Sequence, residues 1–254
     1  MKTIHELFDL SGKTAIVTGG AAGIGKGVAY RLSEAGANVV IADIDLDEAE
    51  KASKEMPGSG IVVRTDVSQE KDVANMVRKA VDTFGGLDIM VNNAGIYPMK
   101  PSLDMTVDEW KRVLDINLRG AFLCAREAAR RMIAQDRGGR IINIASIDSV
   151  HPSFPGLLAY DASKGGLMML TKSLAVELAA SGILVNAIGP GGIRTPGATG
   201  GASEEQSRAF AQRIPLKRLG EPDDIGTVAL FLACDASNYM TGSFIVVDGG
   251  MLVA

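Results

Sequence analysis

The feature that most constrains the fold is a regular alternation of short apolar runs with longer segments of helical periodicity. The apolar runs cover residues 13–18, 38–43, 61–66, 87–92, 140–146, 183–189 and 243–248. Most are almost continuously apolar, as expected for strands that are covered on both faces of a parallel sheet. Because this alternation requires right-handed crossovers, the chain is predicted to be an α/β protein with a doubly wound, seven-stranded parallel sheet flanked by helices.

The 254 residues show no linker, repeat or change of composition, so one domain over residues 1–254 is predicted. Thr106 and Glu109 have the spacing of a capping box, which opens a helix predicted to run to about residue 134. Pro222 stands where the first turn of another helix begins. A stretch rich in Gly, Pro and small residues at 190–203 predicts a mobile substrate loop at about 190–210, with a plain surface linker as the alternative.

Charge and composition exclude several classes of function. The net charge is −4 and no basic tract occurs, so nucleic acid is not an expected partner. No apolar run is long enough for a membrane span, and the first ten residues lack a signal-peptide core, so a cytoplasmic protein is expected. Cys124 and Cys234 lie far apart and are predicted to be core thiols. No metal site is predicted, because His5 and His151 have no ligand spacing to these cysteines.

Glycines cluster between the first strand and the helix that follows it. Gly19, Gly23 and Gly25 have the spacing G-x3-G-x-G, with Ala22 inside the turn. Such a turn lets backbone N–H groups approach a pyrophosphate at a helix N-terminus. The position of the cluster after a strand and before a helix favours a dinucleotide site, and a plain tight turn is the alternative.

Asp43 ends the second predicted strand, 18 residues after Gly25. A carboxylate at this place accepts hydrogen bonds from both hydroxyls of an adenosine ribose and repels a 2′-phosphate. The sequence therefore predicts NAD(H) as the cofactor rather than NADP(H). Lys26 and Arg64 leave the opposite preference open, since either is a possible partner of a phosphate.

Tyr160 and Lys164 are four residues apart at the start of a predicted helix, so both side chains can face one pocket. An ordinary tyrosine has a pKa near 10, and an ammonium group about 4 Å away lowers it toward neutrality. The pair is therefore a candidate acid/base unit. A chance pair on a helix surface is the alternative.

Three polar residues strengthen that interpretation. Ser146 ends the fifth strand, where an open α/β sheet binds its ligands, and its hydroxyl can donate to a substrate oxygen. Asn117 lies in an apolar helix and needs a partner there. Asn93 and Gly95 belong to a turn after the fourth strand that can wrap the edge of a ligand.

In order and spacing, these motifs resemble the short-chain dehydrogenase/reductase family, in its classical NAD-preferring branch. The segments that carry the resemblance are TGGAAGIG at 18–25, NNAG at 92–95, Asn117, Ser146, Y-x3-K at 160–164, PG at 190–191 with Thr195, and VDGG at 247–250. The resemblance spans residues 9–252 and implies a Rossmann fold. It also implies a homotetramer.

The resemblance implies the following roles. Tyr160 exchanges a proton with the substrate oxygen, while Lys164 lowers the pKa of the phenol and holds the nicotinamide ribose. Ser146 orients the substrate oxygen, and Asn117 holds a water in a proton relay. The implied cofactor-binding residues are Gly19, Ala22, Gly23, Ile24, Gly25, Asp43, Asp66, Val67, Asn93, Ala94, Gly95, Tyr160, Lys164, Pro190, Gly191, Ile193 and Thr195.

Within this set, the resemblance places Asp66 at the adenine and Asn93 on the ribose side of the adenosine. Ile193 and Thr195 contact the carboxamide. By the same analogy, the substrate contacts are Tyr97, Asp148, His151, Phe154 and Leu157. For His151 an exposed loop position is the alternative, and for Asp148 a surface position.

The predicted activity is the NAD-dependent transfer of a hydride between nicotinamide and a secondary alcohol or ketone, on a sugar, polyol or other small alcohol. One rival is an NADPH-dependent 3-oxoacyl-[acyl-carrier-protein] reductase. The other is a sensor that binds a dinucleotide without turnover, although such relatives typically lack the Tyr or the Lys, which are both present here.

Overall fold

The computed structural model describes residues 1–199, 201 and 203–254. Its sheet has seven strands in the order β3-β2-β1-β4-β5-β6-β7, and all neighbouring strands are parallel. The strands are β1 (Thr14–Thr18), β2 (Asn38–Asp43), β3 (Gly60–Arg64), β4 (Ile89–Asn92), β5 (Gly139–Ile144), β6 (Ile183–Pro190) and β7 (Phe244–Val247). All seven predicted strands and the fold class are confirmed, and each predicted boundary lies within two residues of the observed one.

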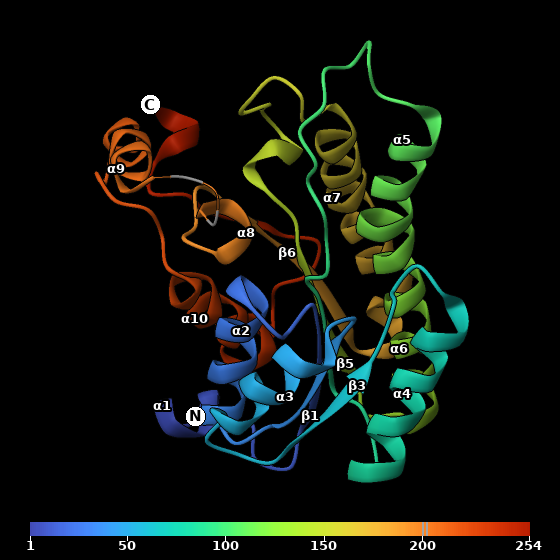
Figure 1. Ribbon diagram of the computed structural model, residues 1–254. Helices are drawn as coiled ribbons and strands as arrows, with labels where there is room; N and C mark the ends of the chain where they lie inside the picture. The colour runs from blue at the N-terminus through green and yellow to red at the C-terminus, as the bar shows by residue number, and fades with distance from the viewer. Residues whose placement is uncertain (200, 202) are drawn as a thin grey trace.

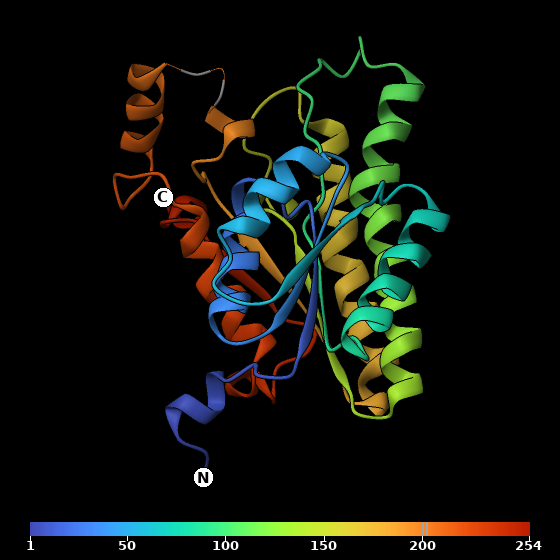
Figure 2. The same ribbon diagram turned by 60° about the horizontal axis from the view of Figure 1, so that its bottom comes forward.

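Helices cover both faces of the sheet (Figures 1 and 2). The α-helices are α1 (Ile4–Phe8), α2 (Gly23–Glu34), α3 (Leu46–Lys54), α4 (Glu70–Phe84), α5 (Val107–Leu114), α6 (Ala121–Gln135), α7 (Leu158–Leu178), α8 (Pro196–Thr199), α9 (Glu204–Arg213) and α10 (Pro222–Ala233). Shorter turns of other helix types are η1 (Asp115–Gly120), η2 (Ile147–Ser149), η3 (Ala179–Ser181), η4 (Asp235–Ser237) and η5 (Met251–Val253). None of these helices is long and apolar enough to cross a membrane, within the part of the chain that is described.

The core forms two layers because successive side chains of a strand point to opposite faces. In β1, Ala15 and Val17 pack in the cluster that includes the buried side of α2, α3 and α10. Ile16, between them, packs in the cluster with α4 and α6. The continuous apolar runs of the sequence are explained by this burial on both sides.

The long helix predicted from Thr106 is interrupted. The Thr106–Glu109 capping box is present, and α5 follows it, but residues 115–120 form a π-helical turn before α6 begins. Helical periodicity in a sequence does not reveal a one-turn change of backbone hydrogen bonding, and such turns often occur at functional sites. The prediction of one regular helix to residue 134 is therefore corrected to two α-helices joined by η1.

The strand order reverses between β1 and β4, which are neighbours in the sheet although β2 and β3 lie between them in the chain. From β1 the chain continues into α2, on one face, and β4 is reached from α4, on the other. Open α/β sheets bind ligands in the crevice outside such a switch point. The turns after β1 and β4 therefore meet at the place where a ligand is expected.

Candidate active site

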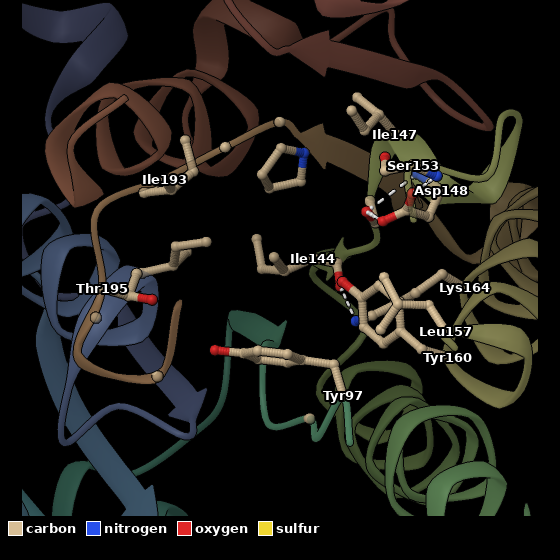
Figure 3. A pocket seen from close by; sticks show the side chains of 18 of the residues that line it. Tyr97, Ile144, Ile147, Asp148, Ser153, Leu157, Tyr160, Lys164, Ile193 and Thr195 are labelled. Atoms are coloured by element: carbon tan, nitrogen blue, oxygen red, sulfur yellow. Dashed lines mark hydrogen bonds between the residues drawn. The ribbon is translucent and has the colours of Figure 1, made fainter. Parts of the chain in front are cut away.

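A pocket of about 970 Å³ lies at the carboxyl ends of the strands. Figure 3 shows Ile193 and Thr195 on one wall, facing Asp148, Tyr160 and Lys164 on the other. Of the predicted site residues, those that line the pocket are Gly19, Ala22, Gly23, Ile24, Asn93, Ala94, Gly95, Tyr97, Ser146, Asp148, Phe154, Leu157, Tyr160, Lys164, Pro190, Gly191, Ile193 and Thr195. Those outside its lining are Gly25, Asp43, Asp66, Val67, Asn117 and His151.

The glycine turn has the backbone that its sequence requires. Gly19 and Gly23 have positive φ, of 63° and 52°, which glycine adopts without steric cost. A Cβ at Gly23 would lie 3.1 Å from Thr195, so the absence of a side chain keeps open the space between this turn and the loop after β6. The N-terminus of α2 begins at this point, so the turn fits the pyrophosphate of a dinucleotide.

Asn93 joins the two turns of the switch point. Its Nδ2 donates to the backbone oxygens of Thr18 and Gly19, each at 2.9 Å. The Thr18 hydroxyl in return accepts from the backbone N–H groups of Asn93 and Ala94. The amide of Asn93 therefore fixes the shape of the glycine turn, a role that the sequence alone did not reveal.

Asp43 contacts the backbone of the same turn. Its Oδ2 accepts from Ala21 N at 3.0 Å, and its Oδ1 accepts from Asp45 N at 3.1 Å. The carboxylate is thus held at the end of β2, beside the glycine turn, where an adenosine ribose is expected.

The two residues implied for the adenine lie after β3. Asp66 Oδ1 accepts from the backbone N–H and the hydroxyl of Ser68, at 2.9 and 2.7 Å. Val67 is buried, and its side chain would meet a Cβ placed on Gly120. Both residues have structural contacts, and a role at the adenine stays a prediction.

Tyr160 and Lys164 face the pocket from the first turns of α7, as the i, i+4 spacing predicts. The Lys164 ammonium lies 5.6 Å from the centre of the Tyr160 ring and donates to Ile144 O at 2.7 Å (Figure 3). Within the described residues, this is the one hydrogen bond that the ammonium makes to the protein. An ammonium has three N–H donors, so two remain for a ligand. The remaining donors fit the hydroxyls of a ribose.

Burial shifts the pKa of both groups, and for Tyr160 the shift is opposite to the predicted direction. Burial raises the pKa of Tyr160 above its ordinary value, a hydrogen bond with Ser146 lowers it, and the charge of Asp148 raises it further. Burial lowers the pKa of Lys164 to about 8. The predicted lowering of the Tyr160 pKa by Lys164 is not found in this structure, because loss of water around the phenolate is the largest effect on this group.

Ser146 lies two residues after the end of β5 and is buried. Its Oγ donates to Asp148 Oδ2 at 2.9 Å and accepts from the backbone N–H of Asp148 at 3.1 Å. Asp148 also accepts from Ser153 N at 2.8 Å (Figure 3). The serine, the phenol and the ammonium are therefore brought to one side of the pocket, and Asp148 is attached to the serine.

Asn117 lies in the π-helical turn, and its side chain makes three hydrogen bonds within the protein. Nδ2 donates to Ile96 O and to Ser163 Oγ, at 2.8 and 3.0 Å, and Oδ1 accepts from Ile96 N at 2.8 Å. The amide thus holds the chain after β4 against α7. Its place in a water relay stays a prediction.

Apolar and aromatic groups form the part of the pocket farther from the glycine turn. Tyr97 packs edge-on against Tyr160 at 5.8 Å, and Phe154 packs against Phe210 of α9 at 5.7 Å. His151 is exposed and lies outside the lining, which matches the alternative considered for it. The lining also includes Ser153, Gln206, Ser207, Phe210 and Met251. No motif marks them, because they come from loops and helices whose packing is set by the rest of the fold.

Comparison with known proteins extends these observations. The profile of the family described as "Enoyl-(Acyl carrier protein) reductase" matches residues 19–252. A 3beta-hydroxysteroid dehydrogenase 1 of Eggerthella lenta is 41% identical over 249 residues, which cover 96% of this chain and 95% of that protein. Glucose 1-dehydrogenase 2 of Bacillus subtilis is 38% identical over 248 residues, which cover 96% of each.

A solved structure agrees with these relatives. The crystal structure of a short-chain type dehydrogenase/reductase from Mycobacterium marinum superposes with a TM-score of 0.95 at 41% sequence identity, and covers 99% of this chain and 100% of that one. The fold, the positions of Ser146, Tyr160 and Lys164 at the pocket, and the matches over nearly the whole sequence all point to the same family. The chain belongs to the short-chain dehydrogenase/reductase family and is an oxidoreductase that acts on CH–OH groups.

Proposed function

We propose that this protein catalyses the NAD-dependent oxidation of a secondary alcohol to a ketone, and the reverse reduction. The bound nicotinamide supplies the hydride acceptor. Tyr160 takes the proton of the substrate hydroxyl, Ser146 holds the substrate oxygen, and Lys164 binds the ribose and keeps positive charge near the phenol. The observation that carries this proposal is that these three side chains lie together on one side of a pocket whose other end is the glycine turn.

The preference for NAD(H) rests on the charge around the adenosine end. Asp43 is held beside the turn by Ala21 N, and its negative charge would repel the 2′-phosphate of NADP(H). Lys26 and Arg64, the two cations that could favour NADP(H), each lie next to a carboxylate of the protein. Lys26 pairs with Glu55 at 2.8 Å, and the exposed Arg64 lies 4.0 Å from Asp72.

Exchanging Asp43 tests this preference. In the double variant Asp43→Ser, Ile44→Arg, the ratio of kcat/KM for NADP⁺ to that for NAD⁺ is expected to rise at least about tenfold, because a repelled phosphate gains a cationic partner. Asp45→Asn is the matched control, since it removes a neighbouring carboxylate whose side chain caps α3. An unchanged ratio in the double variant, or an equal change in the control, would show that another group selects the cofactor.

The lining of the pocket favours a neutral substrate with an apolar body. Tyr97, Met99, Phe154, Leu157 and Phe210 surround the space beside Tyr160. The hydroxysteroid dehydrogenase relative agrees with this class. A sugar or polyol is the second candidate, favoured by the glucose dehydrogenase relative and by polar lining groups such as Gln206.

A panel of alcohols assayed with NAD⁺ distinguishes the two classes. Ring-containing apolar alcohols, steroids among them, are expected to have higher kcat/KM than sugars and polyols, and Phe210→Ala is expected to reduce only the former. If the protein is instead a 3-oxoacyl carrier reductase, NADPH and acyl thioesters are expected to be preferred. If it is a sensor without turnover, no member of the panel is expected to react.

We also propose a homotetramer. An apolar groove runs between η1, α6 and α7, and Phe122 and Met169 are exposed in it. Val176, farther along α7, is also exposed. Met169→Asp is expected to lower the oligomeric state in analytical ultracentrifugation, because burying a charge in an interface is costly. Ile4→Asp, on the distant α1, is the control; a tetramer that survives Met169→Asp would place the interface elsewhere.

The remaining expectations are a cytoplasmic location, one domain over the whole chain, and a mobile loop at about 190–210. The contact between Phe210 and Phe154 supports the loop as a cover of the pocket, since it docks α9 on the substrate side. Residues 200 and 202 of that loop lie outside the described residues.

A further inference from the structure

Asp148 is the carboxylate that lines the described part of the pocket, and both of its oxygens have partners. Oδ2 accepts from the Ser146 hydroxyl at 2.9 Å, and Oδ1 accepts from Ser153 N at 2.8 Å. A carboxylate accepts hydrogen bonds and does not donate them, so the proton between Ser146 and Asp148 belongs to Ser146. Asp148 therefore does not have to touch the substrate to influence the reaction.

A serine hydroxyl has one proton and two lone pairs. The proton of Ser146 is directed at Asp148, and one lone pair accepts from the backbone N–H of Asp148. What Ser146 offers to Tyr160 and to the pocket in this arrangement is a lone pair.

We propose that Asp148 is a positioning residue that holds the hydroxyl proton of Ser146, so that the serine offers its one free lone pair as a hydrogen-bond acceptor to the Tyr160 phenol or to the substrate hydroxyl. An acceptor serine favours the phenol over the phenolate, so Tyr160 must lose its own proton before it takes the proton of an alcohol. This role rests on the proposed function, and it opposes the ionisation that alcohol oxidation requires.

The groups around the phenol agree with this role. The charged groups near Tyr160 are Asp161 and Lys164 on α7 and Asp148 on η2, and the ionisable Tyr97 packs against its ring from the loop after β4. Ser146 lowers the pKa of Tyr160 only as far as it donates to the phenolate, and Asp148 competes for that same proton. Asp148 thus opposes ionisation in two ways, through its charge and through the serine.

The test separates the effect of the Asp148 charge from the effect of its hydrogen bond with Ser146, by comparing substitutions of two carboxylates. Asp148→Asn removes the charge and also frees the Ser146 proton, because the amide that replaces the carboxylate can donate to Oγ. Asp161→Asn removes a charge that also raises the pKa of Tyr160 but is not hydrogen-bonded to Ser146. Burial raises the pKa of Asp161 to about 6, so this residue is ionised at the alkaline pH of the measurement.

The measurement is the ultraviolet absorbance of tyrosinate as a function of pH, with and without saturating NAD⁺. The chain has four tyrosines, so each variant is also titrated with Tyr160→Phe added. The difference between the two titration curves gives the absorbance of Tyr160 alone. Circular dichroism at each pH confirms that the protein stays folded. Asp148→Ala, which leaves Ser146 without a side-chain acceptor at this position, serves as the second variant if the first does not fold.

Asp148→Asn is expected to lower the apparent pKa of Tyr160 by about 1–2 units more than Asp161→Asn does, the effect of gaining a donor to a charged group. In a Ser146→Ala background this excess is expected to disappear. Equal shifts in the two variants, an excess that survives without Ser146, or no titration of Tyr160 in either Asp148 variant would overturn the inference. Failure of the proposed function has a different signature, the absence of turnover with every alcohol, and leaves these titrations readable.

Discussion

Replacing Tyr160 with phenylalanine is expected to reduce kcat for alcohol oxidation by at least about 10²-fold, the low end of the contribution of a positioned acid or base. The substitution removes one oxygen atom and keeps the ring, which packs against Tyr97. The Tyr160 side chain is partly buried and lines the pocket, so its hydroxyl is the group placed to exchange the proton. Steady-state kinetics with the best alcohol of the panel measures the effect.

Tyr97→Phe is the matched control, because it removes the same atom from the second tyrosine of the pocket. Its effect is expected to be smaller and to fall on KM, since Tyr97 is predicted to contact substrate and not to exchange the proton. The dissociation constant for NADH should stay within a few-fold of wild type in Tyr160→Phe. Turnover near the wild-type level in Tyr160→Phe would remove this residue from the reaction.

The layers of the fold and the placement of the candidate catalytic pair could be predicted because local patterns determine them. Continuous apolar runs identify strands that are buried on two faces, and Ile16 and Val17 are indeed buried in opposite layers. Tyr160 and Lys164 share a helix, so their spacing alone places them on one side. The position of Ser146 after a parallel strand brings it to the same edge of the sheet.

The features that could not be predicted depend on contacts between distant segments or on burial. The π-helical turn around Asn117 changes which backbone groups pair, and residue periodicity does not record this. In the sequence Asn93 is an ordinary turn residue, and its hydrogen bond to the backbone of Gly19 becomes visible only in the structure. The direction of the Tyr160 pKa was predicted wrongly because the sequence shows the nearby cation but not the loss of solvent.

Gly25 provides the second large expected effect. A Cβ at this position would overlap the backbone oxygen of Gly19, and it would lie 2.8 Å from Gly19 C and 2.5 Å from Asn93 Nδ2. Backbone cannot rotate away as a side chain can, so Gly25→Ala should displace either α2 or the glycine turn. Overpacking at a rigid contact costs about 3 kcal/mol, equivalent to a decrease in Tm of roughly 6–12 °C for a domain of this size.

The same displacement should weaken dinucleotide binding, because the Gly19 backbone belongs to both the contact and the pocket. Gly165→Ala is the control: it adds the same methyl group to a helix, where the nearest atom recorded is Ser149 O at 3.7 Å, and it is expected to raise stability by up to about 1 kcal/mol. Calorimetry and NADH fluorescence titration measure the two effects. If Gly25→Ala kept the wild-type Tm and the wild-type affinity for NADH, close packing of α2 against the turn would be ruled out as the reason for glycine at this position.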